Sequence, residues 1–170
     1  MRSRSRKSDA MNEPLIRHAE PSDYSPLIAV VDDWWGGREM TDMLPRLFFV
    51  HFRPTSFVAE HRGQIVGFVI GFVSQTFPDE AYIHFIGVHP ECRKSGLGAS
   101  LYERFFAAAA MLGCRKVRCV TSPINKGSVA FHRRMGFFAQ DGGTTIDGMP
   151  VVEGYDGNGE DRVVFTRNLA

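Results

Sequence analysis

Cysteine is scarce in this sequence, and long apolar runs are absent. The three cysteines, Cys92, Cys114 and Cys119, are odd in number and lack C-x-x-C spacing, which argues against a disulfide framework or a zinc site. The six histidines show no H-E-x-x-H or related spacing, so we predict no metal. No apolar run approaches the roughly 20 residues of a membrane span, and no apolar segment follows the basic start. These absences predict a cytoplasmic protein with free thiols and no membrane partner.

A large net charge is absent as well. The 170 residues include 20 basic and 19 acidic side chains, and four of the basic ones lie within the first seven positions. Without residues 1–10, 16 basic and 18 acidic side chains remain, which gives no support for broad nucleic-acid binding. Residues 1–12 are predicted to form a basic, disordered tail. Residues 13–170 are predicted to form one domain, because a chain of this length fills one core but not two.

Hydrophobic periodicity and turn residues predict alternating strands and helices. Strands are expected at residues 15–17, 57–60, 65–73, 81–88, 116–121, 137–140 and 163–169. Helices are expected at residues 24–33, 39–49, 98–112 and 125–135. The segment 141–162 holds six glycines and six acidic residues, which is typical of a functional or disordered loop.

The most informative pattern lies between a strand-like and a helix-like segment. It reads Arg93-Lys94-Ser95-Gly96-Leu97-Gly98. Glycines let consecutive backbone N–H groups converge on an anion at a helix N-terminus, so this run predicts a phosphate cradle. A P-loop would need Lys-Ser/Thr after the second glycine, and a dinucleotide fingerprint would need a third glycine at Leu101. Neither is present.

A second pattern lies downstream at helical spacing. It reads Asn125-x-x-Ser128-x-x-Phe131-His132-x-x-x-Gly136-Phe137. In this order and separated by a strand, the two patterns resemble the acyl-coenzyme A signature of the GNAT N-acyltransferase superfamily. The resemblance covers roughly residues 15–169. It implies an α/β fold with a mixed, mostly antiparallel central sheet, a parallel strand pair that splays apart, and helices on both faces.

The resemblance also implies an enzyme. It would be an N-acetyltransferase that moves an acetyl group from acetyl-coenzyme A to a primary amine by direct attack in a ternary complex. N–H groups of the first pattern would hold the pyrophosphate, the backbone of the preceding strand would pair with the pantetheine amides, and the second helix would present a cap residue and two side chains to the coenzyme. The implied coenzyme residues are Ile86, Gly87, Val88, Arg93, Lys94, Ser95, Gly96, Leu97, Gly98, Ala99, Asn125, Ser128 and Phe131.

Two histidines are candidates for proton transfer. His132 stands where the family usually has a tyrosine that protonates the departing thiolate, and a packed helix histidine is the alternative. The family often has a carboxylate base on the strand before Val88, whereas this chain has Tyr82 and His84 there, on one face by alternation. We predict His84 as the base, with Glu80 as the fallback.

The acceptor is expected between the Trp34-Trp35-Gly36-Gly37 elbow and the acidic segment 141–162. An exposed indole attracts cations, and nearby carboxylates attract amines. Trp34 and Trp35 are therefore the predicted substrate residues, although paired tryptophans often only pack and acidic loops are often only solvated. The predicted partner is a small amine or peptide acceptor, with no nucleic acid, and the chain is expected to be a monomer or homodimer.

Two other functions stay open. The departures at His84 and His132 suggest a non-catalytic acyl-coenzyme A sensor, which would bind acetyl-coenzyme A without amine-dependent turnover. The basic tail suggests a nucleic-acid-binding protein, whose binding would depend steeply on salt and vanish without residues 1–10.

Overall fold

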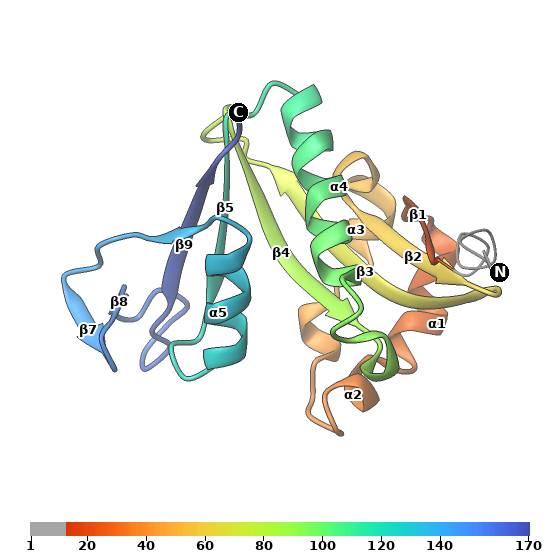
Figure 1. Cartoon of the computed structure of the whole chain (residues 1–170), viewed down its shortest axis with the longest axis horizontal. Helices are drawn as coiled ribbons and strands as arrows, with labels where there is room; N and C mark the ends of the chain where they lie inside the picture. The colour runs from red at the N-terminus through yellow and green to blue at the C-terminus, as the bar shows by residue number, and fades with distance from the viewer. Residues whose placement is uncertain (1–12) are drawn as a thin grey trace, which may run out of the picture. The chain divides into compact units, whose positions relative to one another are not determined.

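The computed structural model describes residues 13–170, drawn in Figure 1, so the predicted tail at residues 1–12 lies outside the described residues. Its strands are β1 Leu15–His18, β2 Phe57–His61, β3 Gln64–Val73, β4 Glu80–Val88, β5 Lys116–Thr121, β6 Phe138–Ala139, β7 Thr144–Ile146, β8 Met149–Val151 and β9 Val163–Asn168. Its α-helices are α1 Tyr24–Ile28, α2 Val31–Trp34, α3 Leu47–His51, α4 Leu97–Met111 and α5 Lys126–Arg134.

Seven strands form one mixed sheet, in the order β1-β2-β3-β4-β5-β9-β6, and β7 and β8 form a separate hairpin. The pairs β1–β2, β2–β3, β5–β9 and β6–β9 are antiparallel, whereas β4 and β5 are parallel. The β4–β5 register joins Glu80–Tyr82 to Lys116–Arg118, which is one end of the nine-residue β4. This arrangement confirms the predicted mixed α/β fold with one parallel strand pair.

The described chain divides into two compact units. The first comprises residues 13–70 and Phe85–Phe105, and the second comprises Gly71–His84 and Phe106–Ala170. Strands β3 and β4 and helix α4 each begin in one unit and end in the other. The prediction of a single domain stays a prediction, and each unit is described separately below.

The first unit packs the start of α4 onto β3. A Cβ built at Gly67 of β3 would lie 3.1 Å from Leu101 Cδ1 and 3.2 Å from Leu97 Cδ2, so glycine allows this close approach. Leu101 and Phe105 of α4 are fully buried, as are Phe68 and its neighbours on β3. Leu97 and Leu101 therefore lie on the face of this helix that contacts β3.

Both predicted N-terminal helices are shorter than expected. The helix expected at residues 24–33 is broken at Val30 into α1 and α2. The one expected at 39–49 is a 3-10 turn, Thr41–Met43, followed by α3, because Pro45 disfavours helical geometry at Leu44. The Asp32 carboxylate holds the turn by accepting from the N–H groups of Met40 at 2.7 Å and Thr41 at 3.0 Å, which lowers its pKa. A hydrogen-bonded contact from the preceding segment thus holds this turn where a continuous helix was expected.

The second unit places α5 and the end of α4 on one face of its strands. Figure 1 shows α5 beside β5 and β9, and the His132 ring stacks on Phe165 of β9 at 5.1 Å. Phe106 of α4 contacts Phe137 at 5.8 Å and lies under the Arg167 guanidinium at 4.2 Å. Since register partners in adjacent strands point to the same side, Tyr82, Arg118 and their partners face the opposite side.

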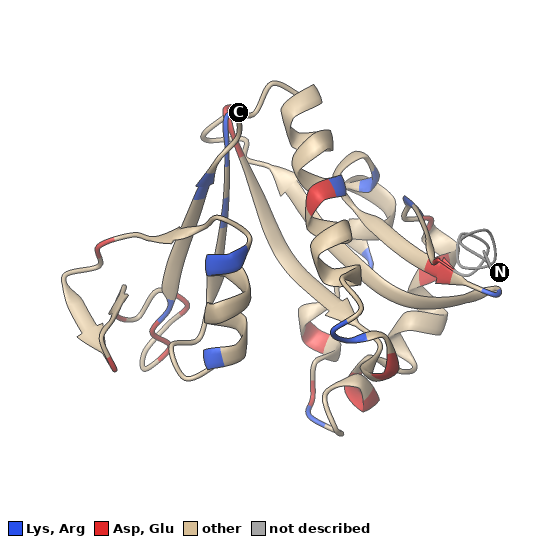
Figure 2. Cartoon of the chain, in the orientation of Figure 1, with Lys and Arg blue, Asp and Glu red and all other residues tan. Residues whose placement is uncertain are grey.

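The segment expected to be a loop, residues 141–162, contains the β7–β8 hairpin and a further loop. Asp147 and Gly148 have left-handed φ angles of 51° and 77°, the backbone of a type I′ hairpin turn. All six acidic side chains of the segment, which are spread along it in Figure 2, have a partner within it or on α5. These carboxylates therefore shape the segment instead of forming an unpaired negative patch.

No helix of residues 13–170 is long and apolar enough to cross a membrane. Within the same residues, no three His, Cys, Asp or Glu side chains gather as a metal site would require. The predicted absence of a metal stays a prediction.

Candidate active site

The loop between β4 and α4 has the backbone that an anion site requires. Lys94 and Gly96 have left-handed φ angles of 62° and 88°, and the Ser100 N–H donates to the Gly96 carbonyl at 3.0 Å. A Cβ built at Gly96 would have no atom within 4 Å, so this backbone borders open space. N–H groups in the first turn of a helix have no partner inside it, and the dipole of the 15-residue α4 favours an anion there. These residues fit a pyrophosphate group.

A cavity of about 570 Å³ lies beside this loop, within the first unit. Its lining includes Ser95, Gly96 and Leu97 of the loop, Ser100 and Arg104 of α4, and part of β1. Three predicted coenzyme residues therefore border a space that has room for more than a phosphate.

Arg93 fixes the loop in place. Its Nε donates to the Val88 carbonyl at 3.2 Å, its Nη2 donates to the Trp34 carbonyl, and its guanidinium lies 5.8 Å from the centre of the Trp35 ring. The side chain thus joins the end of β4, the loop and the tryptophan elbow. The charge of the guanidinium stays near the loop, but its hydrogen bonds point toward backbone carbonyls of the protein. We therefore expect Arg93 to hold the loop that would bind the phosphate in position, as well as to contribute charge.

The two tryptophans have different environments. Trp34 is only 3% exposed, stacks on Phe68 at 6.0 Å and meets His89 edge-on at 5.5 Å. Trp35 is half-buried and contacts Phe85 at 5.1 Å. A buried indole has little surface to offer a cation, so burial supports a packing role for Trp34 and leaves Trp35 as the open member of the pair.

Gly87 makes room for these rings. A Cβ there would lie 2.4 Å from Phe68 Cε1 and 2.9 Å from Trp35 Cη2, distances that real structures do not tolerate. Glycine on β4 therefore allows the tryptophan elbow to pack against the strand whose backbone is predicted to pair with pantetheine.

Burial alternates along β4. Tyr82, His84, Ile86 and Val88 are half-buried, while the residues between them are buried. This burial pattern is the one expected for alternation, and the shared face of Tyr82 and His84 stays a prediction. The predicted coenzyme backbone at Ile86–Val88 belongs to the first unit and His84 to the second.

Glu80, the fallback base, is engaged in ion pairs. It is 7% exposed, and its Oε1 lies 3.1 Å from both Lys116 Nζ and Arg118 Nη2 on the neighbouring strand. Arg118 also donates to Gln140 Oε1 at 2.9 Å. A buried carboxylate with two cationic partners is already satisfied, which favours a structural role over proton abstraction.

We therefore expect Glu80→Gln to act on stability and not on catalysis. The amide leaves two partly buried cations without their carboxylate, which should lower the free energy of unfolding by about 1–3 kcal/mol. Urea unfolding measures this loss, and the Michaelis constants for both substrates serve as the control. An unchanged unfolding midpoint together with a 100-fold lower turnover would instead identify Glu80 as the base.

Asn125 caps α5 as predicted. Its Oδ1 accepts from the Ser128 N–H at 3.1 Å, which satisfies one of the free donors at the helix start. The cap uses the amide oxygen, so the NH₂ group supplies the donors for the predicted bond to pantetheine.

His132 is 4% exposed and enclosed by aromatic rings. Its Nδ1 lies 2.7 Å from the Ser128 carbonyl, and because a carbonyl only accepts, Nδ1 carries the proton. Its ring stacks on Phe165 and meets Phe131 and Phe137 edge-on. Burial lowers the pKa of His132 below its usual value, although the bond to Ser128 opposes this. In the neutral ring Nε2 is therefore an acceptor, and only the minor, charged form has a proton to donate from it.

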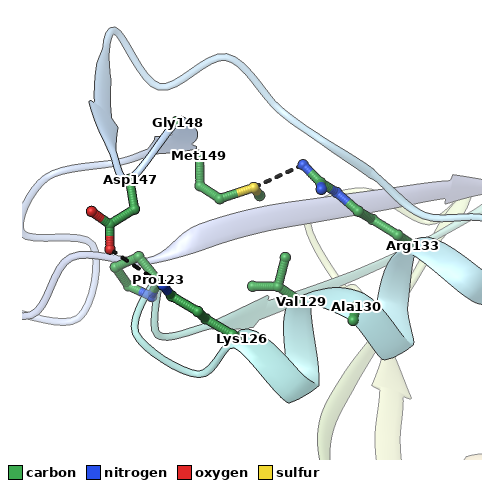
Figure 3. Close-up of a pocket in the computed structure, with 8 residues that line it drawn as sticks. All are labelled: Pro123, Lys126, Val129, Ala130, Arg133, Asp147, Gly148 and Met149. Carbon is green, nitrogen blue, oxygen red and sulfur yellow. Dashed lines mark hydrogen bonds and ion pairs between the residues drawn. The ribbon is translucent and has the colours of Figure 1, made fainter.

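A second cavity, of about 340 Å³, lies between α5 and the hairpin (Figure 3). Lys126, Val129 and Arg133 line it from the helix, and Asp147 and Met149 line it from the hairpin. Arg133 Nη2 donates to Met149 Sδ at 2.8 Å, and Lys126 pairs with Asp147 at 4.0 Å. These contacts fasten the hairpin to a side of α5 different from that of the predicted coenzyme residues.

Fold, loop geometry and cap together define a mixed α/β protein with a glycine-containing loop at the start of a long helix, whose backbone suits an anion. Residues 16–137 match the model of the acetyltransferase (GNAT) family. The chain belongs to this family, which confirms the predicted family and class.

Individual relatives agree with this result. An L-2,4-diaminobutyric acid acetyltransferase from Nocardia farcinica is 34% identical over 123 residues, which cover 72% of this chain and 64% of the relative. The match thus spans between 38% and 64% of the length of the curated relatives.

Solved structures show the same fold. Ard1 from Thermoplasma volcanium has a TM-score of 0.70 at 18% identity, covering 93% of this chain and 99% of that one. The diaminobutyrate acetyltransferase EctA from Paenibacillus lautus, in complex with L-2,4-diaminobutyric acid and coenzyme A, has a TM-score of 0.66 at 21% identity, with coverage of 93% and 96%.

Sequence reasoning missed one feature near the predicted base. Burial, and after it Tyr155 in the loop that follows β8, raise the pKa of Tyr82. No local pattern predicts this proximity, because the two residues are far apart in the chain. The Asp147-Gly148 turn of the preceding hairpin is, in contrast, a sequence signal that could have been used.

Proposed function

We propose that this chain transfers the acetyl group of acetyl-coenzyme A to a small primary amine by direct attack in a ternary complex. The observation that carries the proposal is the loop before α4. Its left-handed Lys94 and Gly96 precede a 15-residue helix, border open space and lie inside the region matched by the family model. Such a helix start binds phosphate groups well.

Acetyl-coenzyme A would be held at several points. N–H groups from Lys94 to Ala99 would bind its pyrophosphate, the backbone of Ile86–Val88 would pair with the pantetheine amides, and the Asn125 NH₂ group would donate to the same arm. Ser128 and Phe131 would contact the coenzyme from α5. These assignments extend the family resemblance to matching positions of this chain.

Proton transfer requires a base and an acid. An alkylammonium with a pKa near 10.4 must lose a proton before its nitrogen can attack the thioester carbon. We assign that proton to His84, directly or through water. As the C–N bond forms and the C–S bond breaks, the attacking nitrogen loses its second proton to solvent and the departing sulfur takes a proton from charged His132, which regains one from solvent. Two alternatives remain. Glu80 is the alternative base, and His132 is the alternative case of a residue that only packs and transfers no proton.

The acceptor we propose is a small amine. The relatives from Nocardia farcinica and Paenibacillus lautus are diaminobutyrate acetyltransferases by name, so L-2,4-diaminobutyric acid is the first probe. A peptide amine is the alternative acceptor. Trp35 is the proposed substrate residue with the more open surface, and Trp34 supports it from the core. A cytoplasmic, monomeric or homodimeric protein stays our prediction.

A thiol-release assay tests the proposal. Full-length protein with acetyl-coenzyme A should release free thiol only when a primary amine is added, and a panel should include L-2,4-diaminobutyric acid, simple diamines and a short peptide. A non-catalytic sensor would bind acetyl-coenzyme A by calorimetry and release no thiol with any amine. That result would replace the proposed function with the sensor.

A further inference from the structure

The end of helix α2 is held by an arginine from the loop between β4 and α4. Trp34 is the last residue of α2, where backbone carbonyls find no N–H partner inside the helix. The Arg93 Nη2 donates to the Trp34 carbonyl, and the Arg93 Nε donates to the Val88 carbonyl at 3.2 Å. Since Val88 is the last residue of β4, one guanidinium joins the end of this strand to the end of α2.

The same side chain holds Trp35 at two points. Its guanidinium lies 5.8 Å from the centre of the Trp35 ring, within the range of a cation–π contact. The Trp34 carbonyl and the Trp35 nitrogen belong to one planar peptide unit, so a bond to this carbonyl fixes the plane from which Trp35 continues the chain. Phe85 contacts the indole at 5.1 Å and further limits where it can move. The setting of Trp35 therefore depends on Arg93.

Beyond Trp35 the tryptophan elbow turns toward open space. Gly36 and Gly37 have left-handed φ angles of 67° and 86°, and a Cβ built at either would have no atom within 4 Å. The N–H groups of Trp35 and Gly37 both donate to the Asp32 carbonyl, at 3.0 and 2.9 Å, so these bonds of the elbow run back to its own helix. Arg93 adds a link from the elbow to the loop that would bind the coenzyme.

Arg93 directly precedes the backbone that would bind the pyrophosphate. The next residue, Lys94, has a left-handed φ angle of 62°, and the proposed N–H donors run from Lys94 to Ala99. An anion bound by these groups would fix the backbone next to Arg93 and attract its guanidinium. The two carbonyl bonds use Nε and one terminal nitrogen of a group with five donors, so Arg93 can keep both bonds and still meet the anion.

We infer that Arg93 is a positioning residue that couples the two substrate sites, an inference that rests on the proposed acetyltransfer and on the proposed place of the acceptor at Trp35. When the coenzyme binds the loop, Arg93 fixes Trp35, and the amine then binds more tightly. Coupling between two sites is reciprocal, so the amine tightens coenzyme binding by the same factor. Arg93, Val88 and both tryptophans lie in the first unit, so the link is built within it.

Tryptophan emission reports on the elbow, because Trp34 and Trp35 are the two tryptophans of the sequence. Coenzyme A, which carries no acetyl group and permits no turnover, is titrated into the wild type, Arg93→Lys and Arg93→Gln. The wild type should change its emission with the midpoint that calorimetry gives for coenzyme A. Both variants should lose most of that change at saturation, because lysine keeps the charge but lacks the planar fork that reaches two carbonyls and stacks on a ring.

Calorimetry measures the coupling itself. L-2,4-diaminobutyric acid, or the best amine of the panel, is titrated with and without saturating coenzyme A. We expect coenzyme A to tighten amine binding to the wild type about 5-fold or more, the lower end of the usual range for coupled sites. Neither Arg93 variant should show this tightening.

The matched control is Arg167→Gln. Arg167 also donates to a backbone carbonyl, that of Met135, and lies 4.2 Å from the centre of the Phe106 ring, but it belongs to the second unit. This variant should keep both the emission change and the coupling.

Three results would each overturn the inference: no emission change in the wild type, a full change in saturated Arg93→Lys, or weaker amine binding to the wild type in the presence of coenzyme A. An emission change that requires Arg93, in a protein that releases no thiol with any amine, would reject the proposed function and keep the link between the loop and the elbow.

Discussion

Gly96→Val should weaken acetyl-coenzyme A binding about 100-fold while the fold persists. The φ angle of 88° at Gly96 is unfavourable for any L-residue and worst for a β-branched one, so the loop must relax away from it. Relaxation separates N–H groups that would otherwise converge on one phosphate. Each hydrogen bond to a charged group contributes roughly 1.5–3 kcal/mol, so the loss of one or two accounts for the expected change.

Calorimetry with acetyl-coenzyme A measures this effect, and Gly63→Val is the matched control. Gly63 has a φ angle of 77° in the turn between β2 and β3, and a Cβ built there also has no atom within 4 Å. The two variants thus share the same backbone strain, but only one lies in the cradle. Equal affinity of the two variants for acetyl-coenzyme A would show that the loop at Gly96 does not bind the pyrophosphate.

His132→Ala should lower turnover by 10²–10⁴-fold, the usual range for a general acid, with little change in affinity for acetyl-coenzyme A. Because burial lowers the pKa of His132, the charged form that donates the proton is lost as pH rises through a value below the usual 6.5. Wild-type turnover limited by this step should therefore decline toward alkaline pH. His132→Tyr should lose that decline, since a phenol stays protonated to about pH 10.

Packing is the competing explanation, and His132→Phe separates the two. Phenylalanine keeps the stacking on Phe165 and the edge contacts with Phe131 and Phe137 but has no proton to donate. An acid role predicts that the Phe variant is as slow as the Ala variant while unfolding at a higher urea concentration. Full turnover in His132→Phe would show that His132 packs in the core and does not act as the acid.

The sequence predicted those parts of the site that local backbone chemistry determines. Glycine at position 96 marks a left-handed residue before a helix, and asparagine at position 125 caps the next one, as the structure confirms. Gly136, with a φ angle of 81°, ends that helix as expected. In each case the residue type and its immediate neighbours specify the conformation, so no tertiary contact had to be known.

The missed features depend on contacts between distant residues. Asp32 accepts from Met40 and Thr41 and closes a turn where a continuous helix was expected. The burial of Trp34 depends on Phe68 and His89, which no pattern around Trp34 specifies. The ion pairs that hold Glu80 likewise form across strands. Local sequence patterns located these segments but not the partners that they meet.

Incubation of the full-length protein with acetyl-coenzyme A labelled in its acetyl group, and with L-2,4-diaminobutyric acid and the amine panel, tests the central claim most directly. The account predicts that mass spectrometry finds the label on the nitrogen of at least one amine, with one free thiol formed for each amide, and that Gly96→Val slows both at limiting acetyl-coenzyme A. Label that remains on the coenzyme with every amine, or leaves it as free acetate at a rate independent of amine, would contradict the account.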